Sequence, residues 1–202
     1  NKILTYKQPI GIAFLITPWN FPAAMYTRKV GAALAAGCAA VLKPASETPL
    51  TALAISKIML EAGALPGTVS VLQTNKPGTL TDAALSDERV GKLSFTGSTG
   101  IGKMLLEKAS QRVLNCSMEL GGNAPFIVLD DADIDAAIDG AMLAKMRNGG
   151  QACTAANRFF VQDKVHDEFV EKLSKRMGAL KVGHGANTET TLAPLVNRKA
   201  VS

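Results

Sequence analysis

Short apolar runs alternate with amphipathic stretches along almost the whole chain, and this alternation restricts the fold more than any other feature. Each apolar run has the length of a buried strand, and the stretches between the runs repeat apolar residues at helical spacing. In the first part of the chain the predicted strands are 10–17, 39–42, 69–72 and 92–96, and the predicted helices are 23–36, 49–62 and 97–110. Strands that alternate with helices are typical of βα units, so the sequence predicts an α/β fold with a parallel sheet.

The sequence predicts the cap, the first residue and the apolar face of the helix 49–62. Thr48 is expected to cap it, Pro49 suits its first position, and Leu50, Ala54 and Ile58 form one apolar face.

The second part of the chain continues the alternation of strands and helices. The predicted strands are 113–118, 126–129 and 158–162. A helix is expected after the acidic residues 130–133, with a buried stripe at every fourth residue from Ile134 to Met146, and another over 165–177. Residues 193–202 have the pattern of a helix that is just beginning. We place the domain boundary near 115–120, which predicts domains at 1–118 and 119–202.

Composition excludes several classes of protein. Of the 202 residues 47% are hydrophobic, which excludes intrinsic disorder, and three cysteines are too few for a disulfide scaffold. The apolar runs are too short for a membrane helix, so no membrane partner is expected. The net charge is +5, but the basic residues are spread along the chain and aromatics are only 5%, so no nucleic-acid partner is expected.

The cysteines also bear on location and metal binding. Cys38, Cys116 and Cys153 are odd in number and lack the spacing of metal ligands, so we expect no metal site. Free thiols and the lack of a signal-peptide pattern predict a cytoplasmic location.

Two features of the first part could bind a phosphate or a ribose. The glycine-rich turn from Gly97 to Gly102 follows a strand and opens a helix, where backbone N–H groups suit a phosphate; a tight turn without a ligand is the alternative. Lys43 ends the second strand and Ser46 follows it, at the place where dinucleotide folds hold the ribose hydroxyls. A solvated surface lysine is the alternative there.

Two further residues could carry covalent or acid–base chemistry. Cys153 is the cysteine in a glycine-rich loop, where a thiol can be reached, although a buried structural cysteine is the alternative. Glu119 lies between apolar residues and two glycines, so its charge is either functional or neutralised by a partner. His166 and His184 lie outside any motif, which leaves Glu119 as the better candidate base.

Five motifs in order resemble the aldehyde dehydrogenase superfamily. They are Pro18-Trp19-Asn20-Phe21-Pro22, Lys43-Pro44-Ala45-Ser46, Phe95-Thr96-Gly97-Ser98-Thr99, Glu119-Leu120-Gly121-Gly122 and Gly150-Gln151-Ala152-Cys153. The resemblance covers essentially all of the chain. It implies a Rossmann-like cofactor domain followed by the start of an α/β catalytic domain.

The resemblance also implies the roles of individual residues. Cys153 would attack the aldehyde carbon, the Asn20 amide and the Cys153 backbone N–H would stabilise the resulting oxyanion, and Glu119 would activate the water that hydrolyses a thioester. The residues implied in cofactor binding are Trp19, Lys43, Ser46, Gly97, Ser98 and Gly102.

The choice of cofactor depends on position 46 in this resemblance. Relatives with glutamate there repel a 2′-phosphate, whereas Ser46 removes that repulsion and lies near Lys43. We therefore expect NADP as the cofactor, with NAD tolerated. Glu47 is expected to point outward, because Thr48 and Pro49 follow it.

The choice of substrate depends on two arginines. The segments around Arg28 and Arg147 resemble those of succinate-semialdehyde dehydrogenases, in which paired arginines bind the distal carboxylate of a small aldehyde. Surface arginines, a dehydrogenase for glutarate semialdehyde and a non-catalytic family member are the alternatives. The chain is less than half of a family-length enzyme, so we expect a fragment of a protein that forms a homo-oligomer.

Overall fold

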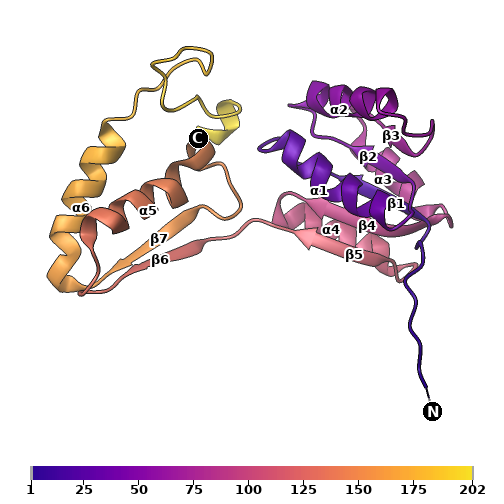
Figure 1. Cartoon of the computed structure of the whole chain (residues 1–202), viewed down its shortest axis with the longest axis horizontal. Helices are drawn as coiled ribbons and strands as arrows, with labels where there is room; N and C mark the ends of the chain where they lie inside the picture. Colours follow the sequence, from indigo (N-terminus) through magenta and orange to yellow (C-terminus); the bar gives the residue numbers. More distant parts are fainter. Residues whose placement is uncertain (1, 202) are drawn as a thin grey trace. The chain divides into compact units, whose positions relative to one another are not determined.

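The computed structural model describes residues 2–201 and divides into two units, 1–120 and 121–202 (Figure 1). Each unit has its own sheet and its own apolar core. The predicted α/β fold with a parallel sheet is confirmed. The division falls after Leu120 because β5 (Asn115–Glu119) continues the first sheet up to Glu119.

The first unit is built on a five-stranded sheet with the order β3-β2-β1-β4-β5, and all four strand pairs are parallel. The other strands are β1 (Ile12–Ile16), β2 (Ala40–Lys43), β3 (Val69–Val71) and β4 (Val90–Thr96). The order along the sheet changes direction at β1, which lies between β2 and β4. In sheets of this kind, ligands bind outside the carboxyl ends of the strands where the order reverses.

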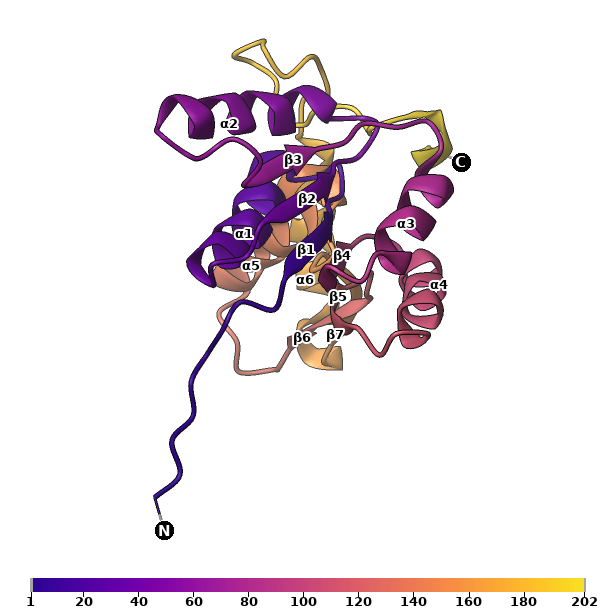
Figure 2. The same cartoon turned by 90° about the vertical axis from the view of Figure 1, so that its right-hand side faces the viewer.

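Helices cover both faces of this sheet (Figure 2). They are α1 (Pro22–Ala35), α2 (Pro49–Glu61), α3 (Pro77–Ser86) and α4 (Thr99–Ser110). The side chains of β1 alternate between the two cores, because Ala13 and Leu15 pack with α1 and α2 while Phe14 and Ile16 pack with α3 and α4. Burial on both faces explains why β1 is a continuous apolar run in the sequence.

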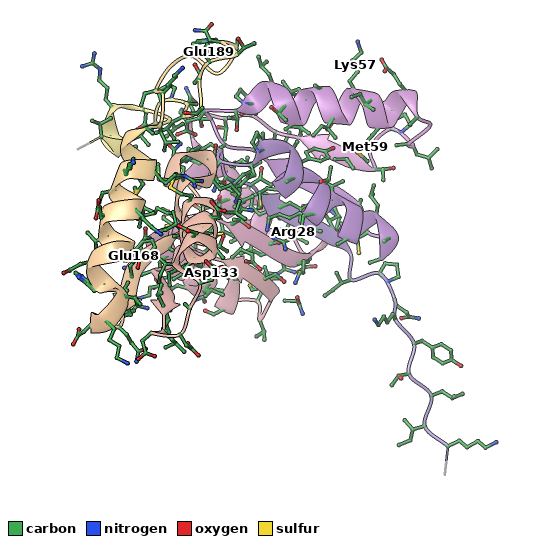
Figure 3. The ribbon with its side chains drawn as sticks, turned by 60° about the vertical axis from the view of Figure 1, so that its left-hand side comes forward. Arg28, Lys57, Met59, Asp133, Glu168 and Glu189 are labelled. Carbon is green, nitrogen blue, oxygen red and sulfur yellow. The ribbon has the colours of Figure 1, made fainter. Side chains whose placement is uncertain are left out.

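The predicted face of α2 was wrong. Leu50 and Ile58 are 77% and 61% exposed, and the helix instead packs through Ala52, Ile55 and Met59. The Tyr26 hydroxyl of α1 forms a hydrogen bond with the Ser56 Oγ at 2.7 Å and donates another to the Met59 sulfur at 3.3 Å. These contacts determine which side of α2 packs against α1. Figure 3 shows Met59 on the side of α2 toward α1 and Lys57 on the outer side.

Two further expectations about this region need correction. The helix α3 lies in a segment for which no helix was predicted, and it contributes Leu85 to the second core. Thr48 precedes α2 as expected, but its side chain makes no capping hydrogen bond. Among the described residues, its buried Oγ1 has no hydrogen-bond partner.

The second unit contains a two-stranded parallel sheet packed against two helices. Its elements are β6 (Ala124–Val128), α5 (Ile134–Met146), the short 3₁₀ turn η1 (Arg147–Gly150), β7 (Ala156–Val161), α6 (Asp163–Gly178) and the 3₁₀ turn η2 (Arg198–Ala200). Three phenylalanines from β6, β7 and α6 gather in the core with ring centroids 5.5–6.3 Å apart: Phe126, Phe159 and Phe169. The Asp133 carboxylate accepts from the Ala136 N–H and caps α5, as carboxylates do at helix N-termini.

The end of the chain differs from the expectation. Only η2 forms within 193–201, where the Asn197 side chain accepts from the Ala200 N–H at 3.1 Å, and Ser202 lies outside the described residues. Over residues 2–201, none of the helices has the length and apolar character needed to cross a membrane.

Candidate active site

A cavity of about 440 Å³ opens at the carboxyl ends of β1, β2 and β4 in the first unit. Its walls come from the segment after β1, the turn after β2, the start of α3, and the junction of β4 with α4. The predicted residues that line it are Trp19, Lys43, Ser46, Gly97 and Ser98. Five residues predicted for one role therefore meet at one cavity, at the place where a parallel sheet presents its ligand site.

Lys43 contributes an amine to this cavity. Its Nζ donates to the Pro44 carbonyl at 3.0 Å, which leaves further N–H groups of the ammonium for a ligand. Burial lowers the pKa of Lys43, and the negative charge of Glu47 opposes that effect. Ser46 is exposed and adds a hydroxyl to the same wall.

Close packing within the protein, as well as room for a ligand, requires the glycines of the glycine-rich turn. A Cβ on Gly97 would lie 2.5 Å from the Phe95 ring, and one on Gly102 would lie 2.5 Å from a Leu120 methyl. The Gly97 N–H donates to the Glu119 carbonyl at 3.1 Å, so this group is already used within the sheet. Gly102 is one turn into α4 and is not among the lining residues, so it supports the turn without forming the wall.

One buried polar atom in the cavity lacks a partner. The Oγ1 of Thr96, at the end of β4, has no hydrogen-bond partner among the described residues although its side chain is buried. An unsatisfied buried hydroxyl in a cavity wall is costly unless a ligand or water bonds to it. Together with the amine, the hydroxyl of Ser46 and the N-terminus of α4, it fits a phosphate- and ribose-containing ligand such as a dinucleotide.

A second cavity, of about 310 Å³, lies between α1 and the sheet of the first unit. Arg28 and Glu119, which were predicted for different roles, both line it, and the position of Arg28 on α1 is labelled in Figure 3. Glu119 is exposed at the last position of β5. A carboxylate and a guanidinium therefore share one cavity, where the first can act on a proton and the second can bind an anion.

Lys29 is a member of this cavity that the sequence interpretation missed. It is 7% exposed, and its Nζ donates to the Ser94 Oγ at 2.8 Å. The signal was present in the sequence, because Lys29 follows Tyr26 by three residues and precedes Ala33 by four, so it falls on the apolar stripe of α1. Burial lowers the pKa of Lys29 from 10.5 to about 8, while the Glu119 carboxylate opposes the change.

Lys29 makes the stability of the chain depend on pH. Because its pKa is lower in the folded state, the unfolded chain binds more protons between pH 8 and 10.5, and the free energy of unfolding rises with pH across this window. At about 1.4 kcal/mol for each pH step, the stability of the wild type relative to Lys29→Met should rise by roughly 3 kcal/mol between pH 7 and 10.5. Urea denaturation of both chains at several pH values measures this difference. A constant difference would contradict the buried charge.

Asn20 lies outside both cavities, in the connection between β1 and α1. Its Oδ1 accepts from the Phe21 N–H at 3.1 Å, and this hydrogen bond orients the side-chain amide. The half-buried position is compatible with donation from the amide nitrogen to a developing oxyanion.

Cys153 lies in the second unit, in the loop between η1 and β7. The loop leaves α5 through three consecutive residues with positive φ, which are Asn148 at 53°, Gly149 at 66° and Gly150 at 76°. The thiol is free and the residue is half-buried. This left-handed path is available because two of the three residues are glycines.

Gln151 holds this loop, and the sequence interpretation used it only as part of a motif. Its Nε2 donates to the Asn148 carbonyl at 3.0 Å, and its Oε1 accepts from the Val196 N–H at 2.9 Å. The second bond joins positions 45 residues apart, so no local pattern could indicate it.

Arg147 begins η1 at the entrance to the cysteine loop. Its guanidinium donates to the Thr154 Oγ1 at 3.3 Å, and both residues line a cavity of about 240 Å³ in the second unit. The exposed Arg147 guanidinium, which precedes the Cys153 loop in the chain, can bind an anionic group of a ligand.

The chain matches the model of the family described as "Aldehyde dehydrogenase family" over residues 1–202. It is 51% identical over 202 residues to the NADP(+) succinate-semialdehyde dehydrogenase of Escherichia coli (strain K12), in a match that covers 100% of this chain and 42% of the relative. It is 52% identical over 202 residues to the glutarate-semialdehyde dehydrogenase of Pseudomonas putida, again over 100% of this chain and 42% of the relative.

A solved structure is equally similar. The crystal structure of succinate-semialdehyde dehydrogenase from Burkholderia pseudomallei matches with a TM-score of 0.94 and 50% identity, covering 97% of this chain and 40% of that chain. The chain spans about two fifths of the length of the relatives that it matches.

Proposed function

Because the chain belongs to the aldehyde dehydrogenase family, we propose that its full-length protein oxidises succinic semialdehyde to succinate with NADP, and that NAD is also accepted. The observation that carries this proposal is the shared cavity of Arg28 and Glu119, which joins an anion-binding group to a candidate base. The E. coli relative, named a succinate-semialdehyde dehydrogenase with NADP(+), supports both the substrate and the cofactor.

In the proposed reaction Cys153 is the nucleophile. Its thiolate adds to the aldehyde carbon and forms a thiohemiacetal, whose oxyanion accepts hydrogen bonds from the Asn20 amide and the Cys153 backbone N–H. Oxidation of that carbon requires an acceptor for two electrons and a hydrogen, which is the chemistry that a bound nicotinamide supplies. Glu119 then takes a proton from water, which attacks the thioester, releases succinate and restores the thiol.

The first cavity is the proposed place of the cofactor. Lys43 and Ser46 would hold the adenosine ribose, with Thr96, Gly97 and Ser98 on the wall at the start of α4. Ser46 carries no charge, so it does not repel a 2′-phosphate, and the Lys43 ammonium attracts one. Trp19 lines the same cavity with an aromatic surface.

Glutarate semialdehyde is the second candidate substrate, because the P. putida relative carries that name at 52% identity. Both molecules combine an aldehyde with a distal carboxylate and differ by one methylene, so Arg28 and Arg147 suit either one. We further propose a homo-oligomeric full-length protein, and a reducing compartment such as the cytoplasm, which suits the three free cysteines.

Removal of Arg147 should separate charged from uncharged substrates. For Arg147→Ala in the full-length protein we expect the KM for succinic semialdehyde to rise about 10- to 100-fold, because a charge-assisted hydrogen bond to the carboxylate is lost. The KM for butanal, which has the same chain length and no carboxylate, should change less than about two-fold. Steady-state formation of reduced nicotinamide measures both values.

The matched control is Arg176→Ala, which removes an exposed arginine of α6 that pairs with Asp139. It should leave both KM values unchanged. Equal losses on the two aldehydes in Arg147→Ala would overturn the carboxylate role, and no turnover of either semialdehyde by the folded wild type would overturn the substrate.

A further inference from the structure

Glu47 occupies a position that its sequence context did not indicate. The Thr48 N–H donates to the Ala45 carbonyl, with 3.4 Å between nitrogen and oxygen. Ser46 and Glu47 are therefore the two central residues of a tight turn after β2. Both of them line the 440 Å³ cavity. Glu47, which was expected to point outward, therefore lies on the same cavity wall as Ser46.

The carboxylate of Glu47 acts on the groups of that wall. It lies close enough to Lys43 for its charge to raise the pKa of the Lys43 ammonium against the effect of burial. The Lys43 Nζ donates its hydrogen bond to the Pro44 carbonyl at 3.0 Å, so the Glu47 carboxylate influences the amine through its charge. The net charge offered to a ligand by this end of the cavity is thus smaller than Lys43 alone would give.

We infer that Glu47 sets the preference between the two dinucleotides, by opposing the 2′-phosphate that Lys43 attracts and Ser46 tolerates. This inference rests on the proposed function, since it takes the cavity as the dinucleotide site. The 2′-phosphate of NADP carries charge at neutral pH, whereas the 2′-hydroxyl of NAD carries none, so a nearby carboxylate penalises only the first. Ser46 thus permits binding of the 2′-phosphate of NADP. The Glu47 carboxylate weakens NADP binding, so NAD can still compete for the site.

The effect is modest and measurable. Two like charges at the separation of neighbouring side chains in a solvated cavity repel by an amount that corresponds to roughly a three- to ten-fold change in affinity. Glu47 is exposed, and within residues 2–201 its side chain makes no hydrogen bond. Its replacement by glutamine should therefore leave the fold intact.

The test is isothermal titration of NADP and of NAD into the full-length protein without aldehyde, so that binding is measured apart from turnover. Glu47→Gln should lower the Kd for NADP about three- to ten-fold and change the Kd for NAD less than about two-fold. Glu47→Asp, which keeps the charge, should remain close to the wild type. Glu61→Gln, an exposed glutamate at the end of α2 that pairs with Lys57, is the matched control and should change neither value.

Salt provides a second readout of the same charge. The difference between Glu47→Gln and the wild type should shrink at high ionic strength, because exposed charges are screened.

The outcomes separate the inference from the function on which it rests. Equal changes for both dinucleotides, or none in Glu47→Gln while both still bind, would overturn the inference and leave the cofactor proposal in place. If the folded wild type binds neither dinucleotide, the cofactor proposal fails first and the role of Glu47 fails with it.

Discussion

Replacement of Cys153 by alanine should lower kcat for aldehyde oxidation by about a thousand-fold or more, because the proposed reaction forms its thioester on the Cys153 sulfur. The loop supports this role. Cys153 is half-buried and free, and its loop is held by Gln151 and by a left-handed path through two glycines. Steady-state kinetics of the full-length Cys153→Ala protein, beside calorimetric titration of the cofactor, would show lost chemistry with binding retained.

Cys116→Ala is the control for that experiment. Burial raises the pKa of the Cys116 thiol, so this cysteine stays protonated near neutral pH and is a poor nucleophile. We expect its replacement to leave kcat within about two-fold of the wild type. Oxidation that survives in Cys153→Ala, or disappears in Cys116→Ala, would assign the nucleophile elsewhere.

Glu119→Gln should separate the two halves of the reaction. Formation of the thioester does not need a base for water, so one equivalent of reduced nicotinamide should appear in a burst. Hydrolysis then lacks its base, and the steady-state rate should fall about 10²- to 10⁴-fold. Stopped-flow absorbance of the reduced nicotinamide resolves the burst from the slow phase.

Glu107→Gln is the matched control, since Glu107 is an exposed glutamate of α4 that lines neither of the two cavities. It should behave as the wild type in both phases. If Glu119→Gln loses the burst together with the steady state, Glu119 acts before or during thioester formation and the assignment as base for the water is wrong.

Local patterns predicted an element well where one apolar stripe or one continuous apolar run marks its buried residues. The stripe from Ile134 to Met146 became α5, and the apolar run around Phe14 became β1 with buried side chains on both faces. The pattern failed for α2, which is apolar nearly all round, so the sequence offered two possible buried faces. Contact with Tyr26 selected the face of Ala52 and Met59.

The residues of the candidate site also fall into those that the sequence indicated and those that it did not. Residues with an unusual chemical character next to a strand end were found from the sequence, among them Lys43, Ser46 and Glu119. Lys29 and Gln151 were missed, because their importance comes from partners far along the chain, at Ser94 and Val196.

The sequence by itself determined the order of the strands and of the helices other than α3, the parallel α/β class and the chemical groups available for reaction, because periodicity and residue type are local properties. Only the tertiary structure decided which groups share a cavity, such as Arg28 with Glu119 and Ser46 with Ser98. It also decided that Lys29 is buried with a lowered pKa. The physical reason is that burial, charge interaction and cavity walls depend on distances in space between residues that lie far apart in the chain.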